Sequence, residues 1–302
     1  MKRILHLLIA VIACPALISL SSVAFAQELT GTLKKIKETN TVIMGIRESS
    51  IPFSYLDDKQ QPVGYAIDLC NKVVDKIKAE LKMPGLKVSL NPVTSQTRIP
   101  LLTNGTIDME CGSTTNSVER QKQVAFSVAY YITAIRMVVK ANSGIKSLKD
   151  LDKQPVVTTT GTTSDRLIKE NEVGQKIDVK NLYAKDHAES FLMVKTDRAK
   201  SFVMDDVLLA GLIANDPNPK DFAIVGESLR TEPYGIMMRK DDPQFKKLID
   251  DVLVGMMKSG EVDKLYTKWF TQPIPPKGIN LTLPMSPELK DAIKNPTDKG
   301  VS

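Results

Sequence analysis

Several residue types that carry chemistry in enzymes and metalloproteins are scarce in this sequence. Among its 302 residues there are two histidines and three cysteines. There is no Cys-x-x-Cys pair and no cluster of histidine and cysteine, which argues against a zinc site. Gly-x-Ser-x-Gly and reactive-cysteine motifs are missing as well. We therefore expect no metal, no other cofactor and no nucleophilic catalysis.

Blocks of like charge are also missing. The 41 lysines and arginines are spread evenly among 35 acidic residues, for a net charge of +6. Nothing resembles the basic patch of a nucleic-acid-binding protein. A mildly positive balance suits a small acidic ligand or an anionic surface.

The chain has one long apolar run, at its start. Residues 4–23 are almost wholly apolar, follow a short basic stretch and precede Ala24-Phe25-Ala26. This pattern predicts a signal peptide over residues 1–26 and export to the periplasm. Two alternatives stay open, a membrane anchor and lipoprotein processing at Cys14. The second is disfavoured because the apolar run continues past Cys14.

Export leaves two cysteines, Cys70 on an apolar helical stripe and Cys111 at the end of a strand-like run. An exported protein can form a disulfide. The sequence does not decide between a disulfide and two buried thiols.

Strand and helix patterns alternate along the rest of the chain, which predicts parallel sheets covered by helices on both faces. Two longer extended runs, 127–139 and 234–239, lie about a hundred residues apart and predict two crossings between two sheets, with a hinge. The expected strands are 41–46, 87–92, 107–111, 155–159, 178–183 and 201–204; the expected helices are 65–81, 99–103, 147–151, 164–171, 190–196, 207–213, 243–258 and 262–270. The last thirty residues are rich in proline and predict a surface wrap or a partly ordered tail.

Two polar loops repeat one pattern. Gly112-Ser113-Thr114-Thr115 and Thr160-Gly161-Thr162-Thr163 each place hydroxyl residues beside a glycine, ahead of a charged run. Loops that follow strands of such sheets carry binding residues, and a helix N-terminus attracts an anion. We predict that the two loops face each other across a cleft and hold one small anion.

Several longer stretches carry a resemblance to a known family. They are GYAIDLCNKVVDKI (64–77), SVERQKQVAFS (117–127) and KLYTKWF (264–270). The chain resembles the periplasmic solute-binding proteins of ABC importers for polar amino acids, nearly end to end after residue 26. GIRESSIPFSYLDDKQQPVGY, TSQTRIPLLTNG and ECGSTTNSVERQKQ are similar to the glutamate/aspartate-binding proteins.

The resemblance implies an α/β, two-lobed periplasmic-binding-protein fold of type II, in which each lobe is a sheet sandwiched by helices and two strands form the hinge. Lobe 1 would comprise residues 27–133 and 233–302, including a C-terminal wrap, and lobe 2 residues 134–232. The protein would be a monomer that delivers L-glutamate or L-aspartate to the permease subunits of a transporter.

The resemblance also implies which residues hold the ligand. Arg120 would bind the α-carboxylate, since a planar guanidinium suits a two-point grip. Asp205 would bind the α-ammonium, although the sequence alone leaves Asp205 and Asp206 equal as helix caps. Donors from both loops would assist Arg120, and a second set would bind the side-chain carboxylate. The donors to the α-carboxylate are Ser113, Thr115 and Thr163; the second set is Arg47, Ser95, Arg98 and His187. Phe53 or Tyr55 would pack on the ligand or form core.

Other functions compete with this one. A dehydratase on the same fold would need a catalytic pair that the sequence does not show, and a sensor domain would need a fused output domain. A glutamine-binding protein is the most serious rival. Its neutral side chain would leave Arg47 and Arg98 without an anion to neutralise.

Overall fold

The computed structural model describes residues 28–302. The predicted signal peptide and the alternative processing site at Cys14 lie outside this range. Within residues 28–302, no helix combines the length and apolar character that a membrane crossing needs.

The first sheet has five strands in the order β5-β1-β6-β14-β7. Its helices cover both faces: α3 packs with one apolar cluster, and α1, α2 and α8 pack with another. The strands are β1 (Thr41–Ile46), β5 (Lys87–Pro92), β6 (Met109–Cys111), β7 (Val124–Phe126) and β14 (Met237–Arg239). The helices are α1 (Gly31–Thr39), α2 (Tyr65–Glu80), α3 (Arg98–Thr103) and α8 (Pro243–Ser259). We call this sheet and its helices lobe 1.

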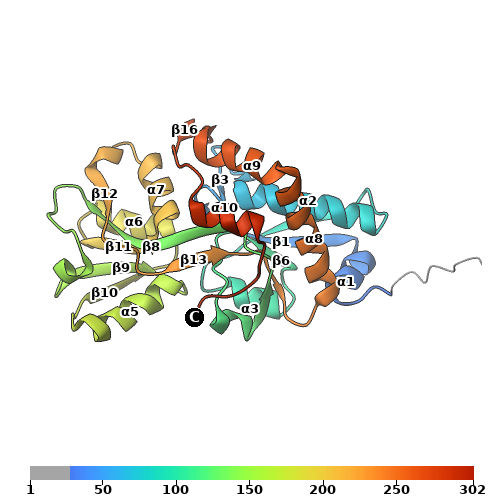
Figure 1. Ribbon diagram of the computed structural model, residues 1–302, viewed down its shortest axis with the longest axis horizontal. Coiled ribbons are helices and arrows are strands. Elements are labelled where there is room, and N and C mark those ends of the chain that lie inside the picture. Colours follow the sequence, from blue (N-terminus) through green and yellow to red (C-terminus); the bar gives the residue numbers. More distant parts are fainter. Residues whose placement is uncertain (1–27) are drawn as a thin grey trace, which may run out of the picture.

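The second sheet has the order β10-β9-β11-β8-β12, with β13 paired to β8. Helix α5 covers one apolar cluster, while α6 and α7 join the other. The strands are β8 (Tyr131–Lys140), β9 (Pro155–Thr159), β10 (Lys180–Ala184), β11 (Ser201–Asp205), β12 (Phe222–Val225) and β13 (Thr231–Tyr234). The helical segments are η1 (Leu148–Leu151), α5 (Thr163–Gln175), α6 (His187–Lys195), α7 (Asp206–Asn215) and η2 (Pro219–Asp221). This sheet and its helices form lobe 2, at the left of Figure 1, with lobe 1 at the right.

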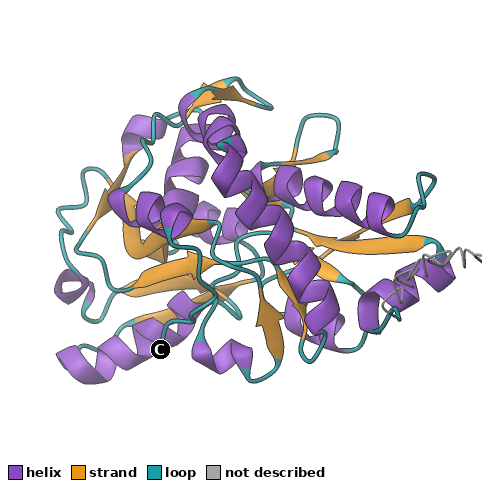
Figure 2. Ribbon diagram, turned by 45° about the vertical axis from the view of Figure 1, so that its right-hand side comes forward, coloured by secondary structure: helices purple, strands orange, loops and turns teal. Residues whose placement is uncertain are grey.

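Two strands join the lobes. The chain enters the second sheet along β8 and returns along β13 and β14, and β8 pairs with β13 in antiparallel register, Tyr131 opposite Tyr234. The predicted extended run 234–239 is thus two strands. The run is interrupted at residues 235–236, where the chain leaves β13 in the second sheet and joins the first sheet as β14. The predicted two-lobed α/β fold with two connecting strands is confirmed (Figure 2).

The prediction of purely parallel sheets is wrong, because both sheets are mixed. In the first sheet, β1 runs parallel to β5 and β6, but β14 runs antiparallel to β6 and β7. In the second, β8 runs antiparallel to β11 and β12. The antiparallel strands are the ones that cross between lobes, and hydrophobic periodicity carries no information about strand direction.

Smaller elements complete the chain, and α10 contacts β8 and α8. They are β2 (Ser49–Ser50), β3 (Ser54–Leu56), β4 (Pro62–Val63), α4 (Val118–Gln121), α9 (Glu261–Tyr266), a π-helical turn (Thr267–Thr271), β15 (Pro273–Ile274), β16 (Ile279–Asn280) and α10 (Pro287–Lys294). In Figure 1, α10 is drawn in red near the middle of the molecule, over the connecting strands.

Cys70 and Cys111 form a disulfide with an S–S distance of 2.08 Å. The bond ties α2 to the end of β6, and both residues are fully buried. The question that the sequence left open is thereby answered in favour of the disulfide.

Candidate functional site

All nine predicted ligand residues are buried in the part of the protein where the lobes meet. Most of them lie at or a few residues beyond the carboxyl ends of strands, the usual place for binding residues in α/β sheets, whereas Arg120 lies on the short helix α4. Arg47 follows β1, His187 follows β10 and Asp205 ends β11. Each of the nine has at most 8% of its surface exposed. Burial of so many polar side chains is costly without partners, so their contacts define the site.

Arg120 bridges the two lobes. Its Nη1 donates to the Thr115 carbonyl at 3.0 Å and its Nη2 donates to the Gly161 carbonyl, on the loop after β9, at 3.2 Å. Gly161 has a φ of +81°, and a Cβ there would lie 2.7 Å from the Gln96 Cα of lobe 1. The two glycine-and-hydroxyl loops therefore face each other across the lobe contact, and that they hold an anion there stays a prediction.

Arg98 belongs to a buried network with a carboxylate that the sequence reasoning missed. Its Nη1 donates to Thr114 Oγ1 at 2.5 Å, and Thr114 Oγ1 donates to Glu110 Oε2 at 2.6 Å. The other carboxylate oxygen of Glu110 lies 4.0 Å from Arg98 Nη1. Within residues 28–302, neither Arg98 Nε nor Ser113 Oγ has a hydrogen-bond partner. These donors are therefore free to serve a ligand.

Arg47 lies between Ser95 and His187. Its Nη2 donates to Ser95 Oγ at 2.9 Å and lies 3.4 Å from His187 Nε2 in lobe 2. Its Nη1 has no partner in the described chain. Burial lowers the pKa of Arg47 to about 10, helped by the nearby positive charge of Arg98, so the guanidinium stays protonated at neutral pH.

Hydrogen bonding assigns the tautomer of His187. Ser190 Oγ donates its single hydrogen to the Asp186 carbonyl, so it accepts from Thr159 Oγ1. Because the hydrogen of Thr159 is then used, Thr159 Oγ1 accepts from His187 Nδ1 at 2.9 Å, and Nδ1 carries the proton of the imidazole. Burial lowers the pKa of His187 well below its usual value, and the charges of Arg47 and Arg98 add to this effect. His187 is thus neutral, with its Nε2 lone pair turned toward Arg47. His187 therefore faces Arg47 as an acceptor and carries no positive charge of its own.

Asp205 is held by Tyr234, whose hydroxyl donates to its Oδ2. Although Asp205 occupies the N-cap position of α7, its side chain makes no capping hydrogen bond. Its Oδ1 has no partner among the described residues. Burial raises the pKa of Asp205 to about 8, with the negative charge of Glu232 as the next cause. A cation placed at Oδ1 would stabilise the ionised form.

Thr163 begins α5, one residue before the predicted helix start, but its hydroxyl is already used. It donates to Glu232 Oε2 at 2.8 Å, and Glu232 Oε1 accepts from Arg230 Nε at 2.7 Å. Thr162, not Thr163, caps the helix. What Thr163 still offers an anion is its position in the first turn, where backbone N–H groups have no partner within the helix.

The residues that sequence reasoning missed are mostly carboxylates and hydroxyls inside strands. Glu110 lies in the middle of β6 and Glu232 in β13, and both are fully buried. A charged residue inside an apolar strand is the signal that could have found them. Phe53 and Tyr55 are core: Phe53 packs edge-on against Tyr131 and Tyr234, and the Tyr55 hydroxyl donates to the Pro275 carbonyl.

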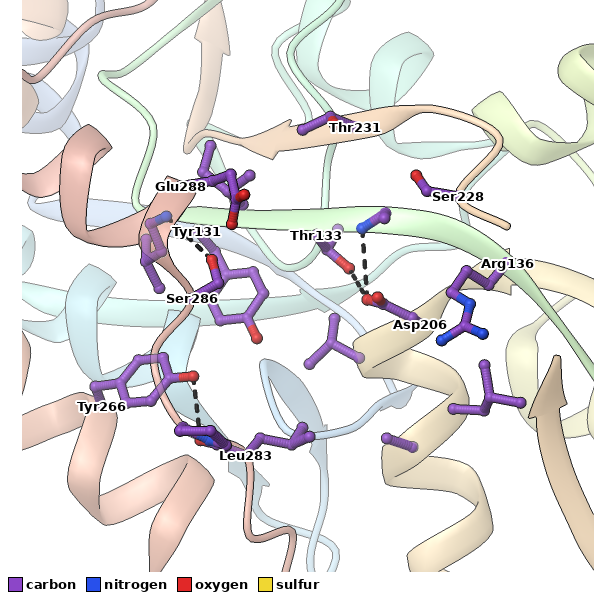
Figure 3. A pocket seen from close by; sticks show the side chains of 17 residues that line it. Tyr131, Thr133, Arg136, Asp206, Ser228, Thr231, Tyr266, Leu283, Ser286 and Glu288 are labelled. Carbon is purple, nitrogen blue, oxygen red and sulfur yellow. Dashed lines mark hydrogen bonds between the residues drawn. The ribbon is translucent and has the colours of Figure 1, made fainter. Parts of the chain in front are cut away.

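A separate cavity of about 490 Å³ lies beside the connecting strands and contains none of the nine residues. Figure 3 shows Asp206 and Thr133 on one side of it, and Tyr266, Ser286 and Glu288 on the other. Thr133 Oγ1 donates to Asp206 Oδ1 at 2.5 Å, so Asp206 ties α7 to β8. Residues 28–302 contain no group of three or more potential metal-ligating side chains.

Known proteins are similar to this chain in sequence and in fold. A family model described as bacterial extracellular solute-binding proteins, family 3, matches residues 42–272. An L-glutamate/L-aspartate-binding protein of Pseudomonas aeruginosa is 53% identical over 93% of each chain. A glutamate/aspartate import solute-binding protein of Escherichia coli is 47% identical over 90% of each chain. Both relatives are named for binding or import rather than for catalysis.

Among solved structures, an ancestral arginine-binding protein bound to glutamine has a TM-score of 0.69 and 34% identity. The similarity covers 76% of this chain and 98% of that one. The resemblance to solute-binding proteins that the motifs suggested is confirmed by these comparisons.

Proposed function

The chain belongs to the bacterial extracellular solute-binding proteins, family 3, and from this premise we propose that it captures L-glutamate or L-aspartate between its lobes for an ABC importer. The ligand would bind lobe 1 first and draw lobe 2 onto it. A ligand can drive such closure only through contacts made with both lobes. The relatives from Pseudomonas aeruginosa and Escherichia coli, named for these two amino acids, support the proposal.

The observation that carries the proposal is the balance of buried charge at the lobe contact. Three guanidinium groups are buried there, those of Arg47, Arg98 and Arg120, opposite the carboxylates Glu110 and Asp205. Glu232 is already paired with an arginine outside this group. A ligand with one ammonium and two carboxylates would pair its ammonium with Asp205. Its two carboxylates, together with Glu110, would neutralise the three guanidinium groups. Glutamine would leave one positive charge buried without an anion, which is costly.

We assign the ends of the ligand accordingly. Arg120, with Ser113, Thr115 and the start of α5 at Thr163, would hold the α-carboxylate, and Asp205 would hold the α-ammonium. The side-chain carboxylate would bind the free donors of a second group, in which His187 orients Arg47. That group is Arg47, Ser95 and Arg98, with His187.

Localisation and partners follow from the same proposal. Cleavage after Ala26 would release the protein into the periplasm, where it would act as a monomer and present its closed form to permease subunits. Lobe 2 would span residues 134–232, with the remainder of the mature chain in lobe 1. Both boundaries fall inside the strands that connect the lobes, β8 (Tyr131–Lys140) and β13 (Thr231–Tyr234), which supports them.

Thermal unfolding of ligand-stripped protein tests the proposal. A ligand at a thousandfold excess over its Kd stabilises the folded state by about 4 kcal/mol. For a chain of this size the melting temperature should rise by roughly 5–15 °C. Glutamate or aspartate should produce the shift, while lysine and leucine should not. If neither acid shifts the transition, the proposed function is wrong.

A further inference from the structure

Residues 297–302, which we call the C-terminal strap, run beside the turn that carries Arg120. Val301 pairs with Ser117 as an isolated parallel bridge. Val301 N donates to the Asn116 carbonyl at 3.1 Å, and Val118 N donates to the Val301 carbonyl at 2.8 Å. Asn116 Nδ2 also donates to the Asp298 carbonyl at 2.7 Å. The strap is thus bonded to the turn on both sides of Ser117.

This brace matters because α4 is only four residues long. One helical turn fixes several backbone angles for a single hydrogen bond and is not stable by itself. The N–H of Val118 lies at the helix start, where no carbonyl of the helix can accept it, and it donates instead to the Val301 carbonyl of the strap. Two other bonds anchor this end: the hydroxyl of Ser117 accepts from Arg120 N at 3.3 Å, and Asn116 N donates to the Pro233 carbonyl at 2.7 Å.

The strap also reaches toward lobe 2. Arg230 Nη1 donates to the Ser302 carbonyl at 3.3 Å, and Arg230 Nε donates to Glu232. Glu232 in turn accepts from Thr163 at the start of α5. The strap therefore contacts the turn that carries Arg120 and connects, through two side chains, with the loop that faces Arg120 from the other lobe.

Gly300 makes the close approach possible. A Cβ at this position would lie 2.9 Å from both Ser117 C and Val118 N. Both are backbone atoms, so no side chain can move aside to admit it. A larger residue at position 300 must push the strap away from the turn.

We propose that the C-terminal strap is a positioning element for Arg120, which holds its guanidinium in the binding geometry before the ligand arrives. The proposal rests on the proposed function, because it concerns the grip on the α-carboxylate. Pre-organisation raises affinity because the side chain then loses less conformational entropy when the ligand binds. Since every α-amino acid carries this carboxylate, loss of the strap weakens glutamate and aspartate by the same factor.

The test compares Gly300→Val with Lys299→Ala in the full chain, by calorimetric titration with glutamate and aspartate. Lys299 is exposed, and its replacement leaves the backbone contacts of the strap in place. Releasing one ordered side chain corresponds to a roughly 2- to 12-fold loss of affinity. We expect this loss for both ligands in Gly300→Val, and less than a twofold change in Lys299→Ala. Asn116→Ala replaces Gly300→Val if that variant does not fold: it removes the tether to Asp298, and with it the bond from Gln121 Nε2 to Asn116 Oδ1, without a clash.

A double-mutant cycle separates positioning from general destabilisation. Arg120→Lys already removes the guanidinium whose position the strap is proposed to fix. Adding Gly300→Val should then cost less than twofold. An equal loss in both backgrounds, or unchanged affinity in both strap variants, overturns the proposal while leaving the proposed function intact. Failure of the unmodified protein to bind either acid overturns both.

Discussion

Replacing Gly161 with alanine tests whether the lobe contact seen here is the one made around the ligand. A Cβ at Gly161 would approach Gln96 Cα to 2.7 Å, Gln96 N to 2.9 Å and the Ser95 carbonyl carbon to 3.0 Å. All three atoms belong to the backbone of the opposite lobe. The lobes would have to stay apart by several tenths of an ångström, which should weaken closure without changing any donor to the ligand.

The expected magnitude has two parts, and a second glycine separates them. Alanine at a positive φ costs roughly 1–2 kcal/mol in either state of the lobes. Gly105 has a φ of +83°, close to the +81° of Gly161, but open space around its Cβ position. Gly105→Ala therefore carries the backbone strain alone. The crowding at Gly161 adds about 1–3 kcal/mol in the closed form, the usual range for overpacking.

The assay is calorimetric titration of both variants with glutamate, beside thermal unfolding without ligand. Gly161→Ala should bind about 5- to 150-fold more weakly than Gly105→Ala, the factor that corresponds to the crowding cost. Without ligand the two variants should melt within a few degrees of each other. Equal affinities would refute the reasoning, because the Gly161–Gln96 approach would then be absent from the bound state.

Three further outcomes are expected. Reducing the Cys70–Cys111 disulfide, which spans a separation of 41 residues, should lower the unfolding free energy by roughly 4 kcal/mol in urea titrations. Arg98→Ala should weaken glutamate by about 2–5 kcal/mol and glutamine by less, measured by calorimetry, and equal losses would contradict the assigned side-chain subsite. Because the folded-state pKa of Asp205 is raised to about 8, its contribution to the stability of the ligand-free protein is full below pH 4 and is lost as pH rises toward 8. Glutamate affinity should rise over the same range, since the ammonium favours the ionised carboxylate, and Asp205→Asn should remove this pH dependence.

The local pattern of the sequence determined much of the secondary structure. The strands 41–46, 87–92 and 155–159 were predicted with the bounds that the structure has, because each is a short run of strand-forming residues between turn signals. Helix starts were placed less well. The predicted helix at 190–196 begins at His187, because Asp186 caps it by accepting from Glu189 N at 2.9 Å. The capping pattern Asp-x-x-Glu was visible in the sequence and was overlooked.

The candidate binding residues were also accessible from the sequence, because most of them follow strands and because long motifs match a known family. Their partners were not. Glu232 and Tyr234 contact Thr163 and Asp205, which lie 69 and 29 residues away in the sequence, and no local pattern encodes such contacts. The neutral state of His187 likewise depends on burial and on two arginines brought in by the fold.

Only the tertiary structure decided three further features: the strand directions in the mixed sheets, the Cys70–Cys111 bond, and the bracing of the Arg120 turn by residues near position 300. Each is a relation between distant parts of the chain. Periodicity and composition record which face of an element is buried. They do not record which other element covers that face, because this choice is made by the packing of the whole core.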